Sequence, residues 1–301
     1  FFFKQKTAYE IYQCDWSSDV CSSDLPTLFP GFSPELADDL RTSLDLFLDE
    51  VAWSEASDFR ELLRADYLIA NARIARFYGL PIPPGEAFAR VPAPGGDRSG
   101  VMTHPYVLAA LSYPKSTSPI HRGVFLTRSI VGRSLRSPPV AVAFNDEEFT
   151  PDMTMRQKVE KLTRAENCQG CHAVINPLGF SLEWYDAAGR FRRAELGRPV
   201  NAASDYVIDD GSAVRLAGAR DVAEFAIANP RSVEAFIEQL FHHLVKQPAV
   251  AFGPDTLPRL RESFVASGHH LRKLLVEIAT FAALHGAEPA LPVASLSPPS
   301  P

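Results

Sequence analysis

The sequence has few cysteines, few methionines and no long uncharged apolar run. Four Cys allow at most two disulfides in 301 residues. No apolar stretch reaches the about 20 residues that a membrane-spanning helix requires, which excludes a span in this sequence. There are 30 basic and 36 acidic residues, and the resulting net charge of −6 argues against a nucleic-acid or anionic-membrane partner. Internal repeats, a P-loop, a Rossmann fingerprint and a G-x-S-x-G elbow are also absent.

The composition that remains is that of a globular chain. Hydrophobic residues make up 46% and charged residues 22%, which excludes collagenous, mucin-like and disordered classes. The length predicts about two domains, each large enough to bury its own core.

The first 25 residues, FFFKQKTAYEIYQCDWSSDVCSSDL, resemble the forced translation of a common short-read sequencing adapter. Two adapter blocks encode residues 4–11 and 14–25 in frame, with a barcode-sized gap between them. We therefore expect residues 1–25 to be an adapter-derived artefact, so that the native start and any signal peptide are lost. Without this segment the chain carries 28 basic and 32 acidic residues, and its cysteines are Cys168 and Cys171.

Apolar periodicity in the rest predicts a mainly α-helical fold with one small β-hairpin. Ser33 as N-cap and Pro34 at the first position start a helix whose apolar stripe reaches Val51. An Asp-Gly turn predicts a hairpin over 206–216. Further helices are expected over 57–78, 154–167, 232–246 and 271–284, with a helix or buried strand over 101–110, a short helix over 126–132 and a loop over 81–100.

Proline-rich stretches suggest the boundaries between units. Ser137-Pro138-Pro139 begins an extended linker, and five prolines follow Ala287. The expected units are the artefact at 1–25, a partial helical domain of unknown function over 26–137, a CxxCH segment with the hairpin over 138–230, a C-terminal helical domain over 231–286 and a disordered tail over 287–301.

Residues 168–172, CQGCH, form the CxxCH signature of c-type haem attachment. Two thiols three residues apart, Cys168 and Cys171, can form thioethers with both vinyl groups of one porphyrin edge. His172 then supplies the proximal imidazole to the iron. Gly170 is expected to keep this turn free of side-chain bulk.

Other residues near the motif are expected to complete a haem pocket. The aromatic candidates for its lining are Phe180, Trp184 and Tyr185. The arginines that could contact propionates, or alternatively form a solvated face, are Arg190, Arg192 and Arg193.

A CxxC pair can also belong to a zinc site or to a thioredoxin-like dithiol. A zinc site needs four ligands, yet no second CxxC remains after residues 1–25 are removed, and His242 and His243 are adjacent rather than three to five apart. A thioredoxin-like dithiol expects a preceding strand, whereas a helix is predicted before Cys168.

The sequence leaves the sixth iron ligand open. No methionine follows Met155, so the downstream Met of a simple cytochrome c is missing. His104 and His121 are the preferred distal candidates, and a five-coordinate haem is the alternative. His242 and His243 are better interpreted as helix histidines of which one is buried.

The segment Asn167 to Arg192, NCQGCHAVINPLGFSLEWYDAAGRFR, closely resembles the cysteine-bearing segment of planctomycete-type cytochrome c-like proteins. Those are multi-domain proteins of unknown function that carry a CxxCH haem motif. Similarity extends to the family's upstream domain over residues 100–104 and 117–123, to its hairpin over 200–218 and to its C-terminal helices over 236–284. The resemblance implies a haem-bearing extracytoplasmic protein, of which this chain is the C-terminal part.

The leading hypothesis is an electron-transfer module with one covalent haem c, located in the periplasm or exported. Its partner would be an extracytoplasmic redox protein or the upstream domains of the same protein. One alternative is a non-redox scaffold in which Cys168 and Cys171 form a local disulfide. A second alternative is a haem enzyme such as a peroxidase, with an open sixth site.

Overall fold

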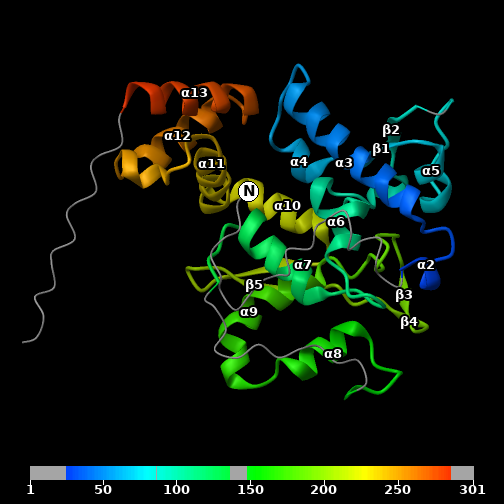
Figure 1. The fold of residues 1–301 in the computed structure, drawn as a ribbon. Helices are drawn as coiled ribbons and strands as arrows, with labels where there is room; N and C mark the ends of the chain where they lie inside the picture. Colours follow the sequence, from blue (N-terminus) through cyan, green and yellow to red (C-terminus); the bar gives the residue numbers. More distant parts are fainter. Residues whose placement is uncertain (1–24, 86, 136–147, 286–301) are drawn as a thin grey trace, which may run out of the picture.

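The computed structural model describes residues 25–85, 87–135 and 148–285, and the described part is mainly helical with three small antiparallel two-stranded sheets. This confirms the predicted fold class (Figure 1). No helix in the described ranges combines the length and apolar character needed to cross a bilayer. The segments predicted as an adapter artefact, a linker and a tail lie mostly or wholly outside the described residues.

The N-terminal helix starts as predicted. Helix α3 (Pro34–Trp53) follows the short α2 (Leu25–Leu28), and the Ser33 hydroxyl accepts a hydrogen bond from the Leu36 N–H at 3.3 Å. This contact satisfies one of the donors that every helix leaves unpaired at its start.

The single helix predicted over 57–78 is wrong. The chain instead forms α4 (Glu61–Arg64), strand β1 (Tyr67–Ala70) and α5 (Ala72–Tyr78), and β1 pairs with β2 (Ala89–Pro92) in the region predicted as a loop. All four residues of β1 are buried, so the apolar run suits a strand covered on both faces. Asn71 restarts the helix by accepting from the Ile74 N–H, and Gly79 ends it in the left-handed conformation that glycine tolerates.

The middle of the chain is built from short helices. Their order is η1 (Pro94–Gly96), η2 (Gly100–Thr103), α6 (Pro105–Ala110), α7 (Pro119–Phe125), the π-helical turn η3 (Leu126–Ile130), α8 (Met155–Leu162) and α9 (Glu166–Phe180). The helix predicted over 154–167 is therefore split, because α8 ends at Leu162 and a new helix starts at Glu166.

The C-terminal part contains the predicted hairpin and four helices. A two-residue pair, β3 (Ala194–Glu195) and β4 (Arg198–Pro199), precedes hairpin strands β5 (Ser204–Val207) and β6 (Ala213–Leu216). Helices α11 (Pro230–Val245) and α13 (Leu271–Leu284) confirm the predictions for those regions. Helices α10 (Ala219–Ala228) and α12 (Thr256–Ala266) were not predicted. A 3₁₀ turn, η5 (Ala249–Phe252), joins α11 to α12.

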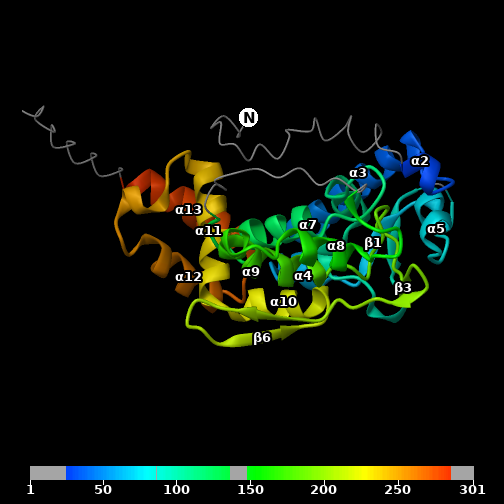
Figure 2. The same ribbon diagram turned by 90° about the horizontal axis from the view of Figure 1, so that it is seen from below.

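One hydrophobic core runs through most of the described molecule. Its buried side chains come from α3, η2, α9, the hairpin and all four C-terminal helices, so it draws on each of the three predicted units. A second cluster lies around α3, β1, α5 and α6. The hairpin lies along one face, with β5 against α9 and β6 against α10 (Figure 2).

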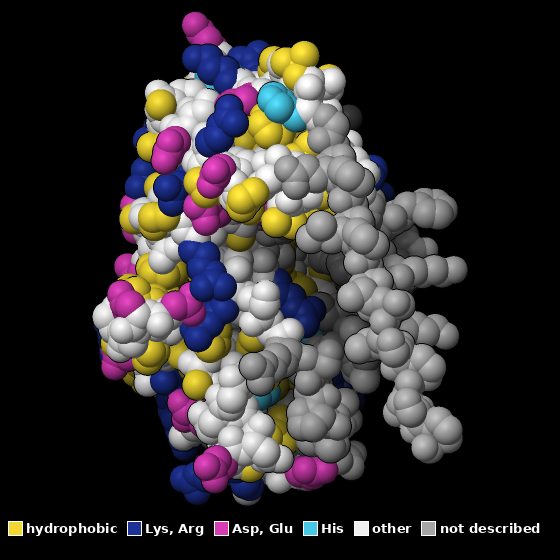
Figure 3. Space-filling view, turned by 90° about the vertical axis from the view of Figure 1, so that its left-hand side faces the viewer, with side chains coloured by type: hydrophobic (Ala, Val, Ile, Leu, Met, Phe, Trp, Pro, Cys, Tyr) yellow, Lys and Arg dark blue, Asp and Glu magenta, His cyan; other side chains and the backbone are white. Residues whose placement is uncertain are grey.

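Charges of both signs are interspersed on the surface viewed from the α13 side, with apolar patches between them (Figure 3). Exposed ion pairs among the described residues include Arg64 with Glu224 and Arg215 with Asp205 at 3.0 Å. Exposed pairs of this kind contribute about 0–1 kcal/mol each, so they do not determine the fold.

Candidate cofactor-attachment site

The CxxCH motif lies in the first two turns of α9. Cys168 and Cys171 are free thiols and both are half-buried, while the intervening Gln169 and Gly170 are exposed. Cys171 and His172 follow Cys168 by three and four residues, so all three side chains share one face of the helix. This end of α9 presents two thiols and an imidazole together.

The described part of the structure leaves open space around Gly170. A Cβ at this position would meet no heavy atom within 4 Å among the residues that the structure describes. The described protein atoms therefore impose no need for glycine here, and the expected crowding around an attached group stays a prediction.

His172 is held by a chain of side chains from both α8 and α9. Its Nδ1 lies 3.0 Å from Asn176 Oδ1, one turn further along the helix. Asn176 Nδ2 donates to Thr163 Oγ1 at 2.9 Å, and Thr163 Oγ1 donates to the Val159 carbonyl at 2.8 Å. Burial lowers the pKa of His172, and the hydrogen bond to Asn176 opposes that effect.

A groove of about 410 Å³ adjoins His172, a volume in the range of ligand sites. One side is formed by Ala173, Pro177 and Phe180 of α9, and the other by polar side chains of α8 and the turn after it. Arg156 stacks on the Phe180 ring at 4.4 Å. The complete lining is Arg156, Glu160, Thr163, Arg164, Gln169, His172, Ala173, Asn176, Pro177, Phe180 and Ser204.

Of the three aromatics predicted to line a pocket, only Phe180 borders this groove. Trp184 stacks on Phe191 at 5.8 Å and donates its indole N–H to the Ala217 carbonyl. Tyr185 is buried in the main core. These two predictions are wrong because the chain turns away from α9 directly after Phe180.

The predicted propionate arginines are also engaged elsewhere. Arg190 pairs with Asp186 at 2.8 Å, and Arg192 pairs with Glu183 at 2.9 Å. Arg193 lies over the Phe191 ring at 5.3 Å. The guanidinium groups at the His172 groove belong to Arg156 and Arg164, which precede the motif.

The far half of α9 is fixed by close contact with α7. The two helices approach so closely that a Cβ on Gly179 would lie 1.9 Å from the Pro119 carbonyl oxygen. A Cβ on Gly123 would likewise lie 2.2 Å from the Ile175 carbonyl oxygen. Only glycine allows this approach. The helix is therefore anchored behind the motif while its first turns project.

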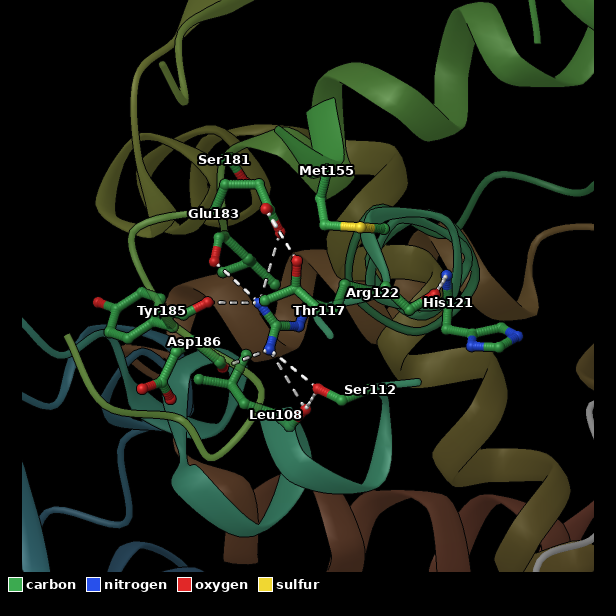
Figure 4. Close-up of polar contacts among 12 residues, drawn as sticks. Leu108, Ser112, Thr117, His121, Arg122, Met155, Ser181, Glu183, Tyr185 and Asp186 are labelled. Carbon is green, nitrogen blue, oxygen red and sulfur yellow. Dashed lines mark hydrogen bonds and ion pairs between the residues drawn. The ribbon is translucent and has the colours of Figure 1, made fainter. Parts of the chain in front are cut away.

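Behind this contact, Arg122 of α7 holds the segment that follows α9 (Figure 4). Its fully buried guanidinium donates to the carbonyls of Leu182, Tyr185 and Asp186 at 3.1, 2.9 and 2.8 Å. Glu183, 2% exposed, lies 3.6 Å away as the buried counter-charge. Burial lowers the pKa of Arg122 to about 10 and raises that of Glu183. This cluster is a structural clamp rather than a solvent-accessible site.

The two distal-ligand candidates lie in different surroundings. His104 is buried and caps α6: its Nδ1 accepts from the Tyr106 N–H at 3.3 Å, and its Nε2 lies 3.2 Å from Ser43 Oγ. Both of its ring nitrogens are therefore engaged by the protein. His121, in the first turn of α7, packs against the Tyr113 ring at 5.2 Å, and burial lowers its pKa. Neither borders the groove beside His172.

Sequence reasoning missed Asn176, Thr163 and Arg156. Arg156, Glu160 and Thr163 follow one another at intervals of four and three, which places them on one face of the helix before the motif. This spacing could have identified Arg156 from the sequence as a residue on the same helix face as Thr163. The contact of Thr163 with Asn176 depends on the break between α8 and α9, which the periodicity did not reveal.

Comparison with known families gives two matches. Residues 98–195, about a third of the chain and including the motif, are similar to the model described as PSCyt3, a protein of unknown function (DUF1588). Residues 10–80 are similar to the model described as PSD4, a protein of unknown function (DUF1592). That second match begins inside the segment predicted to be an adapter artefact, and this prediction remains untested.

No curated protein and no solved structure matches the chain. Over the matched residues, the predicted resemblance is confirmed at the level of two planctomycete cytochrome-like families of unknown function.

Proposed function

We propose that this chain binds one covalent haem c through Cys168, Cys171 and His172 and transfers electrons outside the cytoplasm. The observation that carries the proposal is the juxtaposition of two free thiols and one oriented imidazole on the projecting end of an anchored helix. The name of the family model matched by residues 98–195, PSCyt3, supports the same chemistry.

The donor set fits the attachment chemistry of such a group. Each thiol, Cys168 Sγ and Cys171 Sγ, would add across one vinyl group, which forms a C–S bond without any oxidant. His172 would donate the lone pair of Nε2, the ring nitrogen that the Asn176 contact leaves free. Arg164 would supply positive charge for carboxylates at the groove, next to Arg156, which is itself paired with Glu160 at 2.8 Å. When bound, the haem would supply a one-electron Fe(III)/Fe(II) couple.

The proposal also implies a compartment and partners. Covalent attachment of haem c takes place outside the cytoplasm, so the protein would be periplasmic or exported. An oxidoreductase would then donate one electron, and a second carrier or an upstream domain of the same protein would accept it.

The test is expression of the full chain together with a c-type maturation system. We expect a haem-stained band and a reduced pyridine haemochrome spectrum, both lost in the Cys168→Ser/Cys171→Ser double variant. His172→Ala should keep the covalent haem but change the iron's spin state and Soret band. His243→Ala, an exposed histidine of α11, is the matched control and should change nothing.

Apo protein under these conditions would overturn the proposal. Mass spectrometry then separates the two remaining cases. A Cys168–Cys171 disulfide would favour the scaffold alternative, and free thiols would leave the motif without a cofactor. Turnover of peroxide by a haem-loaded protein would instead favour the haem-enzyme alternative.

A further inference from the structure

We infer that Asn176, held by Thr163, is a positioning residue that fixes the tautomer of His172 and directs its Nε2 lone pair into the groove. The inference deepens the proposed function and rests on it for its consequence at the iron. The geometry of the three side chains, however, is independent of any cofactor.

The direction of each hydrogen bond follows from the last acceptor in the chain. A backbone carbonyl has no proton, so Thr163 Oγ1 must be the donor to the Val159 carbonyl. The same hydroxyl must then accept from the amide nitrogen of Asn176. The amide oxygen is therefore the atom that faces His172.

This order fixes the proton on the imidazole. An amide oxygen accepts only, so Nδ1 of His172 must carry the hydrogen in the bond to Asn176 at 3.0 Å. A neutral imidazole with a proton on Nδ1 has its lone pair on Nε2. That nitrogen is the one a metal would bind, and a hydrogen bond to the other nitrogen is how proteins commonly orient a histidine ligand.

Burial makes the arrangement rigid. Asn176 is 8% exposed and Thr163 is 3% exposed, so water cannot readily replace a lost partner. Rotation of the amide by 180° would place its NH₂ against Nδ1 and its oxygen against a hydroxyl that already donates elsewhere. The break between α8 and α9 makes the contact possible, because it places Thr163, at the end of α8, beside the second half of α9.

The first test reads the tautomer in the haem-free full chain by ¹⁵N NMR of the histidine rings. We expect His172 to be protonated on Nδ1 in the wild type. Thr163→Val removes the hydroxyl that orients the amide and should raise the population of the Nε2–H form. A wild-type His172 that is protonated on Nε2 would overturn the inference, whether or not haem binds.

The second test reads the haem itself. In Asn176→Asp an ionised carboxylate would accept from Nδ1–H, make the imidazole a stronger donor and stabilise Fe(III). At a fixed solution potential, the ratio of oxidised to reduced haem should rise at least tenfold. This corresponds to a midpoint potential lower by 59 mV for a one-electron couple.

The matched control is Asn167→Asp, the same charge change on the exposed first turn of the same helix. It should alter the ratio less than threefold, because water screens that position. Equal shifts in the two variants would refute the positioning role while leaving haem attachment intact. If the wild type and both variants fail to take up haem while NMR shows the Nδ1–H tautomer, the proposed function is refuted and the positioning role is not.

Discussion

His104 should make the fold sensitive to acid, and replacement by asparagine should remove that sensitivity. Because Nδ1 accepts the Tyr106 N–H, the proton of the neutral ring is on Nε2 and faces Ser43 Oγ. Burial, aided by the nearby charge of Arg98, lowers the pKa of His104 from 6.5 to about 3. The unfolded chain takes up a proton on this ring near pH 6.5, whereas the folded chain does so only near pH 3.

The sign follows from this difference in bound protons. Below pH 6.5 the unfolded state binds more protons than the folded state, so the free energy of unfolding falls as the pH falls. The contribution is complete above pH 6.5 and is lost progressively down to about pH 3. At about 1.4 kcal/mol per pKa unit, the loss is about 2 kcal/mol at pH 5 and about 4 kcal/mol at pH 3, where the folded ring is itself half protonated.

Urea unfolding at pH 7.5 and pH 5.0 measures the effect. Asparagine at position 104 can still cap α6, since its side-chain oxygen accepts the same N–H, but it does not titrate. We expect wild type to lose about 2 kcal/mol more than His104→Asn between the two pH values. The other histidines are present in both proteins and cancel in the comparison. An equal loss in the two proteins would refute the assignment to His104.

Three further variants test the anchoring of α9. Gly123→Ala should cost about 1–3 kcal/mol of unfolding free energy, because its Cβ would overlap the Ile175 carbonyl. Gly170→Ala should stabilise by about 0.5–1 kcal/mol, because alanine loses less backbone entropy than glycine in a helix and its Cβ would meet no described atom. Similar urea midpoints for the two would contradict the close packing. Arg122→Met should cost about 3–5 kcal/mol, since it leaves Glu183 with less compensation in the core, and a loss under about 1 kcal/mol would contradict the clamp.

The sequence predicted helices well where a cap and a long stripe coincided. In α3 the Ser33 cap and a periodic apolar face agree, and α13 has the predicted bounds. The region 57–78 failed because its apolar residues fit both a helix and a buried strand, and β1 is stabilised by pairing with β2, a partner about 20 residues away. Local periodicity carries no information about that pairing.

In the candidate site, too, local spacing predicts some features, while others depend on contacts between separate helices. The CxxCH spacing is local, so the sequence alone identifies Cys168, Cys171 and His172 as one face. The orientation of His172 is not local, because Thr163 belongs to another helix and reaches Asn176 only through the turn between α8 and α9. Arg190 and Arg192 do not line the groove beside His172, because the chain leaves it after Phe180 and the two side chains pair with Asp186 and the buried Glu183.

The two halves of α9 thus have different roles: the first carries the candidate attachment residues, and the second anchors the helix in the fold. The first turns contribute two half-buried thiols, which the core does not need, while the second half carries the Gly179 contact and leads into the Arg122 clamp. Loss of the thiols should therefore leave the free energy of unfolding nearly unchanged, whereas loss of the anchor should not. His172 and Asn176 lie at the junction, where a buried amide joins the anchored half of the helix to the half-buried imidazole. This junction is where a change in protein packing would be transmitted most directly to a ligated metal.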